Sequence, residues 1–472
     1  MAGLSVGEYY ATAAVRRRIR EYGGATAPNE ELSCISIAAL NSGEGPRYRW
    51  ELASMVPPVR LDDVLASGAD FGRSLWDRRD VLFYLDLDYH NQDCPGEAFA
   101  HPLDTFAILE PVYRATRVLL RRFGIRALAT VSGRGYHFVG RLDRESSVVN
   151  ALAGLPSDAP HWVRSYERRR EPWMPSVMPE HDARVYSGLG MITEHLGHLI
   201  QKRAARTARL PVVFNGTAVG AARLGRESVS IDLSHFGDPL DQRHVRSAFS
   251  TYQLHLHRPD IFGIWPARHL PALATVLRTS DNLLPLIDSG RTLERAIVQA
   301  TRESAVLPET SEGVARLLDH YSRSRLAAFH TRFTRELADA SAEPSLPVQM
   351  DVPPCVAQPL RWPNDLLLRP EYIQHVARYF LAAGWPAGRI AALLSSLYTT
   401  DGIWGSHWER VDPRARAEFD VRVFAGLVAT GRDRALDFNC TSAQEKGLCP
   451  RGACSHDLRR DRALLLNREV TV

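Results

Sequence analysis

Several features are scarce in this 472-residue sequence, and each absence argues against a class of protein. No apolar run is long enough to cross a bilayer, which argues against a membrane-spanning helix. The first residues lack the basic and apolar blocks of a signal peptide, so we expect a cytoplasmic protein without a membrane partner. Neither an internal repeat nor a low-complexity tract is present. With 45% hydrophobic and 24% charged residues, the chain reads as globular, and its length indicates two or three domains.

Lysine is nearly absent, since Lys202 and Lys446 are the only two, and almost all of the 58 basic residues are arginine. A GC-rich genome favours arginine, so most of these residues are compatible with an ordinary protein surface. Some are clustered, as in Arg16 to Arg20, Arg121-Arg122 and Arg168 to Arg170. Guanidinium groups pair with phosphate through two hydrogen bonds, and such clusters weakly favour a nucleic-acid partner.

Cysteine is also scarce, with six in the chain and none between Cys94 and Cys355. A cytosolic protein of this size does not rely on a disulfide framework. We expect Cys34 and Cys94 to be ordinary, partly buried thiols. Three of the others crowd into the last few dozen residues, which points to a metal or iron–sulfur site. These three are Cys440, Cys449 and Cys454.

The most informative stretch runs from Val81 to Asn91. Five apolar residues rich in β-formers lead directly into Asp86 and Asp88, which predicts a buried strand that ends at an active site. Side chains two apart on a strand share a face, so the two carboxylates should lie side by side. Two like charges that close ionise readily only around a cation, and hard oxygen ligands suit Mg²⁺ or Mn²⁺. A strand end with solvated or arginine-paired acids is the alternative.

Two further segments carry polar groups beside predicted strands. Residues 127–140 contain two β-rich runs joined by Ser132-Gly133-Arg134-Gly135, which predicts a hairpin with His137 near its turn. Residues 227–234 predict another strand, which carries Asp232. Three carboxylates with basic groups nearby are what a two-metal phosphoryl-transfer site requires. For His137 alone, the alternative is a core histidine that is hydrogen-bonded across the sheet.

Helical patterns occupy much of the remaining chain. Residues 104–123 predict a helix that ends at Gly124. Residues 183–208 also predict a helix, on which Glu194, His195 and His198 read as a polar face rather than a metal site. Further helical or turn segments are predicted at 9–22, 241–249, 290–338, 370–383 and 387–397.

The D-x-D strand, the hairpin and the later acid, in this order, resemble the catalytic subunit of the archaeo-eukaryotic primase superfamily. Asp86 and Asp88 correspond to the first motif, Ser132 to His137 to an S-G-x-x-G-x-H-like turn, and Asp232 to the third motif. The turn is one residue shorter here than in the family pattern. The resemblance implies an RRM-like core in which Asp86, Asp88 and Asp232 bind two catalytic Mg²⁺ or Mn²⁺ ions.

The same resemblance implies which residues bind the incoming nucleotide. They are Ser132, Arg134, His137, Arg243, Arg246 and Ser250. The family's R-x-P-G-S-x-H turn is altered here, because Ala248-Phe249 replaces the Pro-Gly and Tyr252 takes the place of the histidine. The zinc-bearing insertion common in primase small subunits is also missing. We therefore expect a trimmed catalytic core.

The C-terminal part carries a second resemblance. A Pro353-Pro354-Cys355 segment, a helix with His375 and Arg378, and a run from Cys440 to Cys454 follow the order of the iron–sulfur domain of the primase large subunit. In that family the domain grips the template and the initiating nucleotide. The resemblance therefore implies this role for His375 and Arg378.

The resemblance also implies a [4Fe–4S] cluster held by four thiolates. They are those of Cys355, Cys440, Cys449 and Cys454. Spacing alone leaves a structural zinc site open, with His456 or Cys355 as the fourth ligand.

Together these features predict an α/β (α+β) protein with an RRM-like catalytic domain at 1–335, a linker at 336–350 and a mainly helical iron–sulfur domain at 351–472. We expect a DNA-dependent primase that starts RNA or DNA primers on single-stranded DNA from nucleoside triphosphates. A helicase or other replication or defence proteins are further expected partners. The nearer alternative is a polymerase of the same superfamily that only extends existing ends. The farther one is a non-catalytic nucleic-acid-binding protein.

Overall fold

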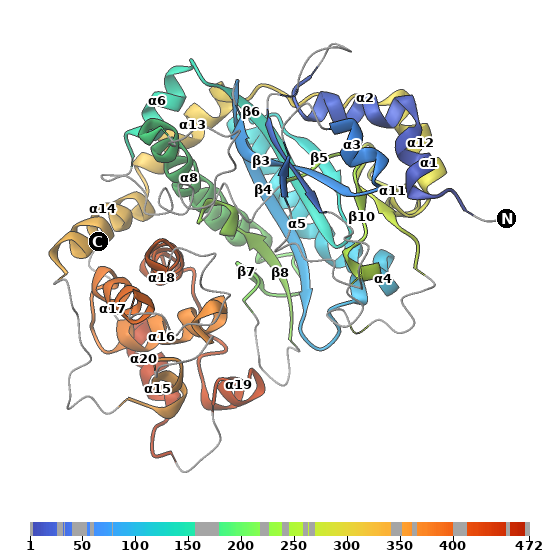
Figure 1. Cartoon of the computed structure of the whole chain (residues 1–472). Helices are drawn as coiled ribbons and strands as arrows, with labels where there is room; N and C mark the ends of the chain where they lie inside the picture. The colour runs from blue at the N-terminus through green and yellow to red at the C-terminus, as the bar shows by residue number, and fades with distance from the viewer. Residues whose placement is uncertain are drawn as a thin grey trace.

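The computed structural model of the chain is mixed α and β, as predicted (Figure 1). Among the described residues, no helix combines the length and the apolar character that crossing a bilayer requires. The described residues are 3–25, 32, 34–39, 54–56, 61–77, 79–155, 179–217, 226–237, 245–257, 263, 270–340, 352–360, 366–399, 413–449 and 454–467.

A six-stranded sheet forms the centre of the N-terminal part. Its strand order is β12-β5-β6-β4-β8-β7, and only the pair β7–β8 is parallel. The strands are β4 (Asp80–Asn91), β5 (Leu128–Val131), β6 (Gly135–Asp143), β7 (Val212–Phe214), β8 (Glu227–Asp232) and β12 (Val276–Leu277). The hairpin predicted at 127–140 is confirmed by the antiparallel pairing of β5 with β6.

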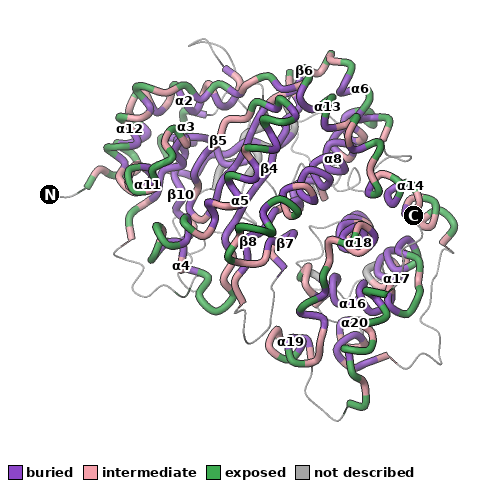
Figure 2. The backbone as a smooth tube through the Cα atoms, turned by 180° about the vertical axis from the view of Figure 1, so that it is seen from behind, coloured by how far each residue is buried: buried purple, intermediate pink, exposed green. Residues whose placement is uncertain are grey.

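Two long helices, α5 (Pro102–Phe123) and α8 (Glu180–Ala204), cover one face of this sheet. Aromatic side chains join the layers, since the Tyr113 ring of α5 stacks on Phe138 of β6 with centroids 5.4 Å apart. In Figure 2 most of β4 and α8 is purple, which marks buried residues. The chain order β4-α5-β5-β6-α8-β8, with the sheet order β5-β6-β4-β8, forms two interleaved βαβ units.

Local sequence signals define both ends of helix α5. Pro102 occupies the first turn, where no intrahelical hydrogen bond is lost, and Gly124 ends the helix with a left-handed φ of 68°. Pro111 does not break the helix, because the carbonyl that it leaves without a donor belongs to the exposed Ala107. The helix predicted at 104–123 is therefore confirmed.

The opposite face of the six-stranded sheet looks toward a second sheet, of order β2-β1-β3-β9. Its strands are β1 (Cys34–Ala39), β2 (Ser54–Val56), β3 (Asp70–Asp77) and β9 (Val245–Arg246). The helical or turn segment predicted at 241–249 was wrong for residues 245 and 246, because Val245 pairs with Arg73 of β3 instead. A small ribbon of β10 (Thr251–Tyr252) and β11 (Leu273–Ala274) follows.

Strand β4 also corrects a prediction. It does not end at the D-x-D motif but continues through Asp88 to Asn91. Both neighbouring strands hold it there, since Asp88 pairs with Gly135 of β6 and Asn91 pairs with Glu227 of β8. The two acids therefore lie inside a strand that is hydrogen-bonded on both sides, which fixes their side chains more firmly than a strand end would.

Helices surround the sheets and continue into the C-terminal part. Those of the N-terminal part are α1 (Val6–Ala11), α2 (Ala13–Tyr22), α3 (Leu61–Ala66), α4 (Glu97–Ala100), α6 (Ser147–Ala153), α9 (Leu254–His257), α11 (Leu283–Arg291), α12 (Leu293–Arg302), α13 (Ser311–Ser322) and α14 (Arg325–Asp339). Those of the C-terminal part are α15 (Pro354–Leu360), α16 (Pro370–Ala382), α17 (Ala387–Thr399), α18 (Pro413–Ala429), α19 (Cys440–Glu445) and α20 (Leu458–Asn467). The helices predicted near 370–383 and 387–397 are confirmed.

Helix α14 belongs to both parts of the chain. It follows α13 closely, yet it packs against α17 and α18. The linker predicted at 336–350 therefore begins inside a helix, since α14 extends to Asp339, and residues 341–350 lie outside the described part of the chain. The polar face predicted for α8 is not exposed to solvent. Glu194, His195 and His198 are all buried, because α13, α14 and α18 cover them.

This buried contact should make folding sensitive to acid. Burial is the main cause that lowers the pKa of His198 to about 4 and that of His195 to about 3. The folded state therefore disfavours their protonation, while the unfolded chain protonates them below a pKa of 6.5. The contribution of these two histidines to the free energy of unfolding is therefore fully present above pH 6.5, and it is lost as the pH falls from 6.5 toward 4. The charged and titratable groups that face the two histidines are Glu194, His320, His330 and Arg432, and Arg422 contacts Glu194 in turn.

One pH unit below the unfolded pKa of 6.5, each of the two histidines should lower the free energy of unfolding by about 1.4 kcal/mol. Thermal unfolding followed between pH 8 and pH 5 measures this loss. A His198→Gln variant should lose less stability on acidification than the native chain, and a variant of the exposed His181 to Gln should behave like the native chain. If acidification destabilised the native chain and both variants equally, the buried histidines would not be the cause of the loss.

Candidate metal-binding active site

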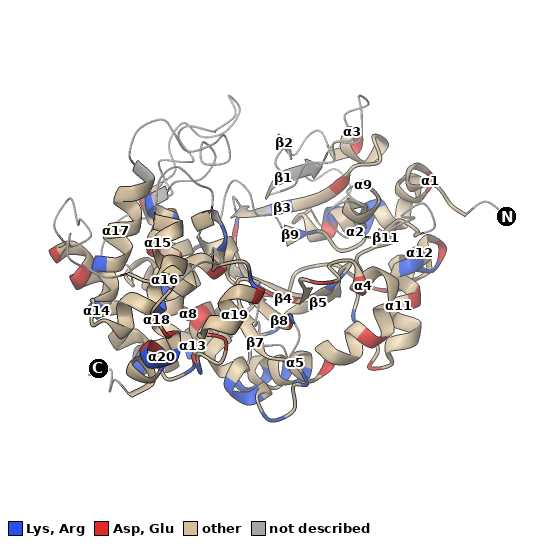
Figure 3. Ribbon diagram, turned by 90° about the horizontal axis from the view of Figure 1, so that it is seen from below, with Lys and Arg blue, Asp and Glu red and all other residues tan. Residues whose placement is uncertain are grey.

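The three sequence motifs meet in one row across three adjacent strands. Strand pairing sets Asp86 of β4 opposite His137 of β6 on one side and opposite Asp232 of β8 on the other. Residues paired across antiparallel strands have Cβ atoms about 5 Å apart and project from the same face. Figure 3 shows the acidic positions of β4 and β8 next to each other. Pairing thus brings together residues that lie up to 146 positions apart in numbering.

The turn between β5 and β6 packs tightly against Asp88, the second acid of the D-x-D motif. A Cβ atom on Gly135 would lie 2.0 Å from the backbone oxygen of Leu87 and 2.6 Å from Oδ1 of Asp88. Only glycine therefore fits opposite the D-x-D strand. Within the turn, Ser132 donates its backbone N–H to the carbonyl of Gly135 at 2.9 Å, which closes the loop.

We expect Gly135→Ala to lower the free energy of unfolding by about 1–3 kcal/mol, because the added methyl group meets backbone that cannot shift without breaking the β4–β6 ladder. Gly7→Ala in α1 is the matched control. A Cβ atom there meets nothing within 4 Å, and alanine favours a helix over glycine by about 0.5–1 kcal/mol. Urea unfolding of both variants tests the difference, and equal stabilities would contradict the tight turn.

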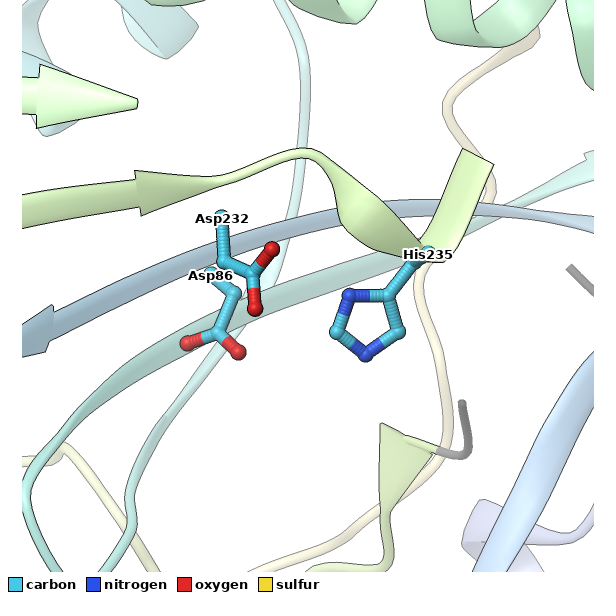
Figure 4. Close-up of side chains that lie close together, drawn as sticks. All are labelled: Asp86, Asp232 and His235. Carbon is cyan, nitrogen blue, oxygen red and sulfur yellow. The ribbon is translucent and has the colours of Figure 1, made fainter. Parts of the chain in front are cut away.

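Asp86, Asp232 and His235 form a candidate cation site. One ligand atom from each lies within 4.8 Å of the others, and no other group of three such residues among the described ranges meets that condition. Figure 4 shows the two carboxylates side by side, with the imidazole ring turned toward them. His235 lies in the short 3₁₀ turn Ser234–Phe236 directly after β8, and its ring packs edge-on against Tyr84 at 4.6 Å.

The electrostatics of the site fit a cation. Burial, together with the nearby Asp88 and Asp232, raises the pKa of Asp86 well above its usual range. Among the described residues, Oδ1 of Asp86 is buried and has no hydrogen-bond partner, while Oδ2 accepts from the Tyr84 hydroxyl at 3.1 Å. A buried carboxylate with a free oxygen beside two other acids is a donor set that a divalent cation matches.

Asp88 and Arg134 form an ion pair at the edge of this site. Nη2 and Nε of Arg134 lie 2.8 and 3.0 Å from Oδ2 of Asp88, and the pair raises the pKa of the guanidinium against the opposing effect of burial. Asp88 is therefore held by arginine, and it is Asp86, Asp232 and His235 that converge on one point. Asp88 as a metal ligand stays a prediction that requires the arginine to move.

His137 faces Asp86 as a neutral ring. Its Nε2 lies 3.7 Å from Oδ1 of Asp86, and burial lowers its pKa to about 4. Its Nδ1 is buried and makes no hydrogen bond to any residue that the structure describes. The ring is therefore available to a ligand as a hydrogen-bonding group and does not compete with a metal as a positive charge.

The other predicted nucleotide contacts lie in the layer above. Arg246 of β9 is near enough for its charge to act on His137, but it is buried, pairs with Asp70 at 2.9 Å and lies over the ring of Tyr252 at 4.4 Å. Ser250 is fully buried, and its hydroxyl accepts the N–H of Phe71. Both stay predictions as nucleotide contacts. Arg243 lies outside the described residues.

Of the four C-terminal cysteines, Cys355 is near enough to the other three for their charges to act on it. Cys355 is buried, and burial together with the charges of the other three thiols raises its pKa to about 12. His375 sits beside it, with Nε2 3.3 Å from the Cys355 sulfur. The other three are Cys440 and Cys449, which are partly buried, and Cys454, which is exposed. Cys94 is exposed rather than partly buried as predicted, and the side chain of Cys34 lies outside the described part.

The spacing of these thiols bears on the choice between zinc and a cluster. Four sulfurs around one zinc ion, at about 2.3 Å each, lie about 3.8 Å apart. In the described residues, no three cysteines or histidines bring their ligand atoms within 4.8 Å of one another. The four thiols are thus spread more widely than a single zinc ion needs.

Arg378 has a different environment from the one its predicted role implies. Its guanidinium is buried and forms hydrogen bonds with Asp433 at 2.7 and 2.8 Å and with Asp437 at 3.1 Å. These acids raise its pKa although burial opposes its charge. In this structure Arg378 ties α16 to the loop after α18, so template contact by Arg378 stays a prediction.

No protein-family model matches the chain, and no curated protein matches it.

One residue of the site was not predicted from the sequence. His235 follows Asp232 by three residues, and an isolated histidine after a strand carries little signal. Its position depends on the 3₁₀ turn, in which Oδ1 of Asp232 accepts the backbone N–H of Ser234 at 2.8 Å. An Asp-x-x-His pattern directly after a predicted catalytic strand was the available signal.

Proposed function

We propose that this chain is a template-directed nucleotidyltransferase of the archaeo-eukaryotic primase superfamily that starts primers on single-stranded DNA. The observation that carries the proposal is the cross-strand row of His137, Asp86 and Asp232, because it joins the three motifs at one buried cation site. The interleaved βαβ order around this row supports an RRM-like core.

Each residue of the site would have its own role in nucleotidyl transfer. Asp86 and Asp232, with His235, would hold a Mg²⁺ or Mn²⁺ ion. Such an ion lowers the pKa of an attacking 3′-hydroxyl and offsets charge on a leaving pyrophosphate. Arg134, which pairs with Asp88 next to these acids, would contribute a permanent positive charge to the binding of a triphosphate. His137, neutral at physiological pH, offers a hydrogen bond to a phosphate oxygen.

The function is tested on the full-length chain with unprimed single-stranded DNA. Labelled ribo- or deoxyribonucleoside triphosphates are supplied with Mg²⁺ or Mn²⁺, and a parallel reaction contains a chelator. We expect short products that depend on the metal, with the active nucleotide class identifying the primer as RNA or DNA. Extension only when a primer is supplied would favour a polymerase that adds to existing ends. Tight DNA binding without synthesis in either format would favour the non-catalytic protein.

We further propose that the four C-terminal thiols hold a [4Fe–4S] cluster. Two observations support this: the charges of the other three thiols act on Cys355, and no three cysteine or histidine ligand atoms of the described residues lie within 4.8 Å of one another. After anaerobic reconstitution we expect about four iron atoms per chain and visible absorbance from thiolate-to-iron charge transfer. Cys449→Ser should lower the iron content severalfold. Cys94→Ser, which changes an exposed thiol of the N-terminal part, should leave it unchanged. One zinc per chain and no visible absorbance would overturn the cluster.

A further inference from the structure

A cavity of about 640 Å³ lies between the two parts of the chain, away from the row of acids. One wall is the end of α8 and the edge strand β7, and the other is α16 with the loop after α18. Figure 1 shows α8 and β7 beside the C-terminal helices. Its volume is in the range of small-molecule sites, which is about 300–1,000 Å³. The proposed function gives this cavity no role.

The cavity walls carry positive charge without a matching negative charge. Lys202 and Arg209 contribute from the first part, and Arg432 and Arg434 contribute from the second. None of these four side chains forms an ion pair with a residue that the structure describes. The acids in the wall are already engaged, because Arg378 binds both Asp433 and Asp437.

Two amide side chains in the wall have hydrogen-bonding groups that no described residue satisfies. Gln374 is only 6% exposed, and no described residue forms a hydrogen bond with its side chain. Gln201 donates Nε2–H to the carbonyl of Val212 at 2.9 Å, but its Oε1 is buried without a partner. A buried amide without hydrogen bonds is costly unless a ligand or water supplies them.

We propose that this interdomain cavity binds a nucleotide, with its phosphates on the four cations and its polar base or sugar groups on the two amides. Guanidinium forks match phosphate oxygens in pairs, and amide groups donate to and accept from base edges. The nucleotide is either a free nucleoside triphosphate or a unit of a single strand, because both present the same groups. A ligand that contacts both parts of the chain ties them together. The proposal does not depend on the catalytic assignment of the acids.

Binding to the full-length chain is measured by calorimetry in the presence of a chelator, which removes metal-dependent binding at the acids. ATP and an unphosphorylated 12-residue oligo-dT are tested separately. The variants are Lys202→Ala/Arg209→Ala, Arg432→Ala/Arg434→Ala and Gln374→Leu. The control is Arg460→Ala, an exposed arginine of α20 outside the cavity. Unchanged thermal unfolding of each variant without ligand establishes that it is folded.

We expect each double variant to weaken Kd at least tenfold for one of the two ligands, Gln374→Leu to weaken it severalfold and Arg460→Ala to leave it unchanged. If the cavity variants lose affinity for ATP alone, the natural ligand is a free nucleotide. If they lose affinity for the oligonucleotide alone, the natural ligand is a single strand. Absence of binding by both ligands to the native chain, or binding that all cavity variants keep, would overturn the proposal. Because the chelator prevents catalysis, these outcomes are separate from those of the primer-synthesis assay.

Discussion

Asp86→Asn should reduce primer synthesis by at least about 1,000-fold, which corresponds to about 4 kcal/mol of lost transition-state stabilisation. Asp86 is the centre of the cross-strand row and one of the three residues that converge on the cation site. Asparagine keeps the shape of the side chain but removes the negative charge that a divalent cation needs. The loss should appear with both Mg²⁺ and Mn²⁺.

The same substitution should not weaken the fold. Burial and the neighbouring acids already oppose a charge at Asp86, so a neutral side chain of the same size removes a like-charge contact. We therefore expect the thermal unfolding midpoint of Asp86→Asn, measured without metal, to equal or exceed that of the native chain. A loss of activity that came from unfolding would show the opposite change.

Asp80→Asn is the matched control because it makes the same chemical change on the same strand. Asp80 lies six residues before Asp86, about 20 Å along β4, where it pairs with Arg141 at 2.9 Å. We expect its activity to stay within about twofold of the native value, which is well under 1 kcal/mol. If Asp86→Asn kept comparable activity, Asp86 could not be a ligand of the catalytic metal.

Arg422→Leu should lower the free energy of unfolding by about 3–5 kcal/mol, because it leaves a buried charge without its partner. Glu194 of α8 is fully buried, and Nη2 of Arg422 lies 3.2 Å from its Oε2. Burial opposes ionisation of Glu194, but His330 and Arg422 outweigh it and lower the pKa to about 2. Glu194 is therefore charged at neutral pH in the native chain, and Arg422 is one of the two groups that keep it so.

This contact joins the two parts of the chain, since α8 belongs to the proposed catalytic domain and α18 to the C-terminal helices. Arg414→Leu on the same helix is the control. Arg414 is about half exposed and pairs with Glu418 one turn away, so its loss should cost less than about 0.5 kcal/mol. Urea unfolding, followed by circular dichroism, measures both variants.

A second change separates the buried charge from lost packing. Glu194→Gln combined with Arg422→Leu removes the unpaired charge, so the double variant should be more stable than Arg422→Leu alone. Equal costs for Arg422→Leu and Arg414→Leu would show that the contact between α8 and α18 does not depend on this ion pair.

The sequence identified the chemical groups of the candidate site but not their arrangement. The run of apolar residues before Asp86, the glycines of the turn and the acid at Asp232 are local signals, because strand and turn preferences depend on neighbouring residues. Which strands pair, and in which register, depends on contacts between distant segments. Only that register places His137 and Asp232 on either side of Asp86 and holds Asp88 against Arg134.

The features that the sequence did not reveal have the same origin. The periodicity of α8 distinguishes polar from apolar positions, but it does not tell whether a second domain covers the polar side, so the burial of Glu194 was not predicted. No local pattern indicated that the Arg378 guanidinium binds Asp433 and Asp437, because these acids are 55 and 59 residues away in the chain.

The sequence by itself determined the mixed α and β composition, the helix at 104–123, the β5–β6 hairpin and the residue types that would bind a cation. Local hydrogen bonding and side-chain alternation are sufficient for these features. The tertiary structure alone decided the place of His235, the burial of Glu194 and the basic cavity between the two parts. Each of these depends on surfaces that meet only when remote segments pack, and no local pattern encodes them.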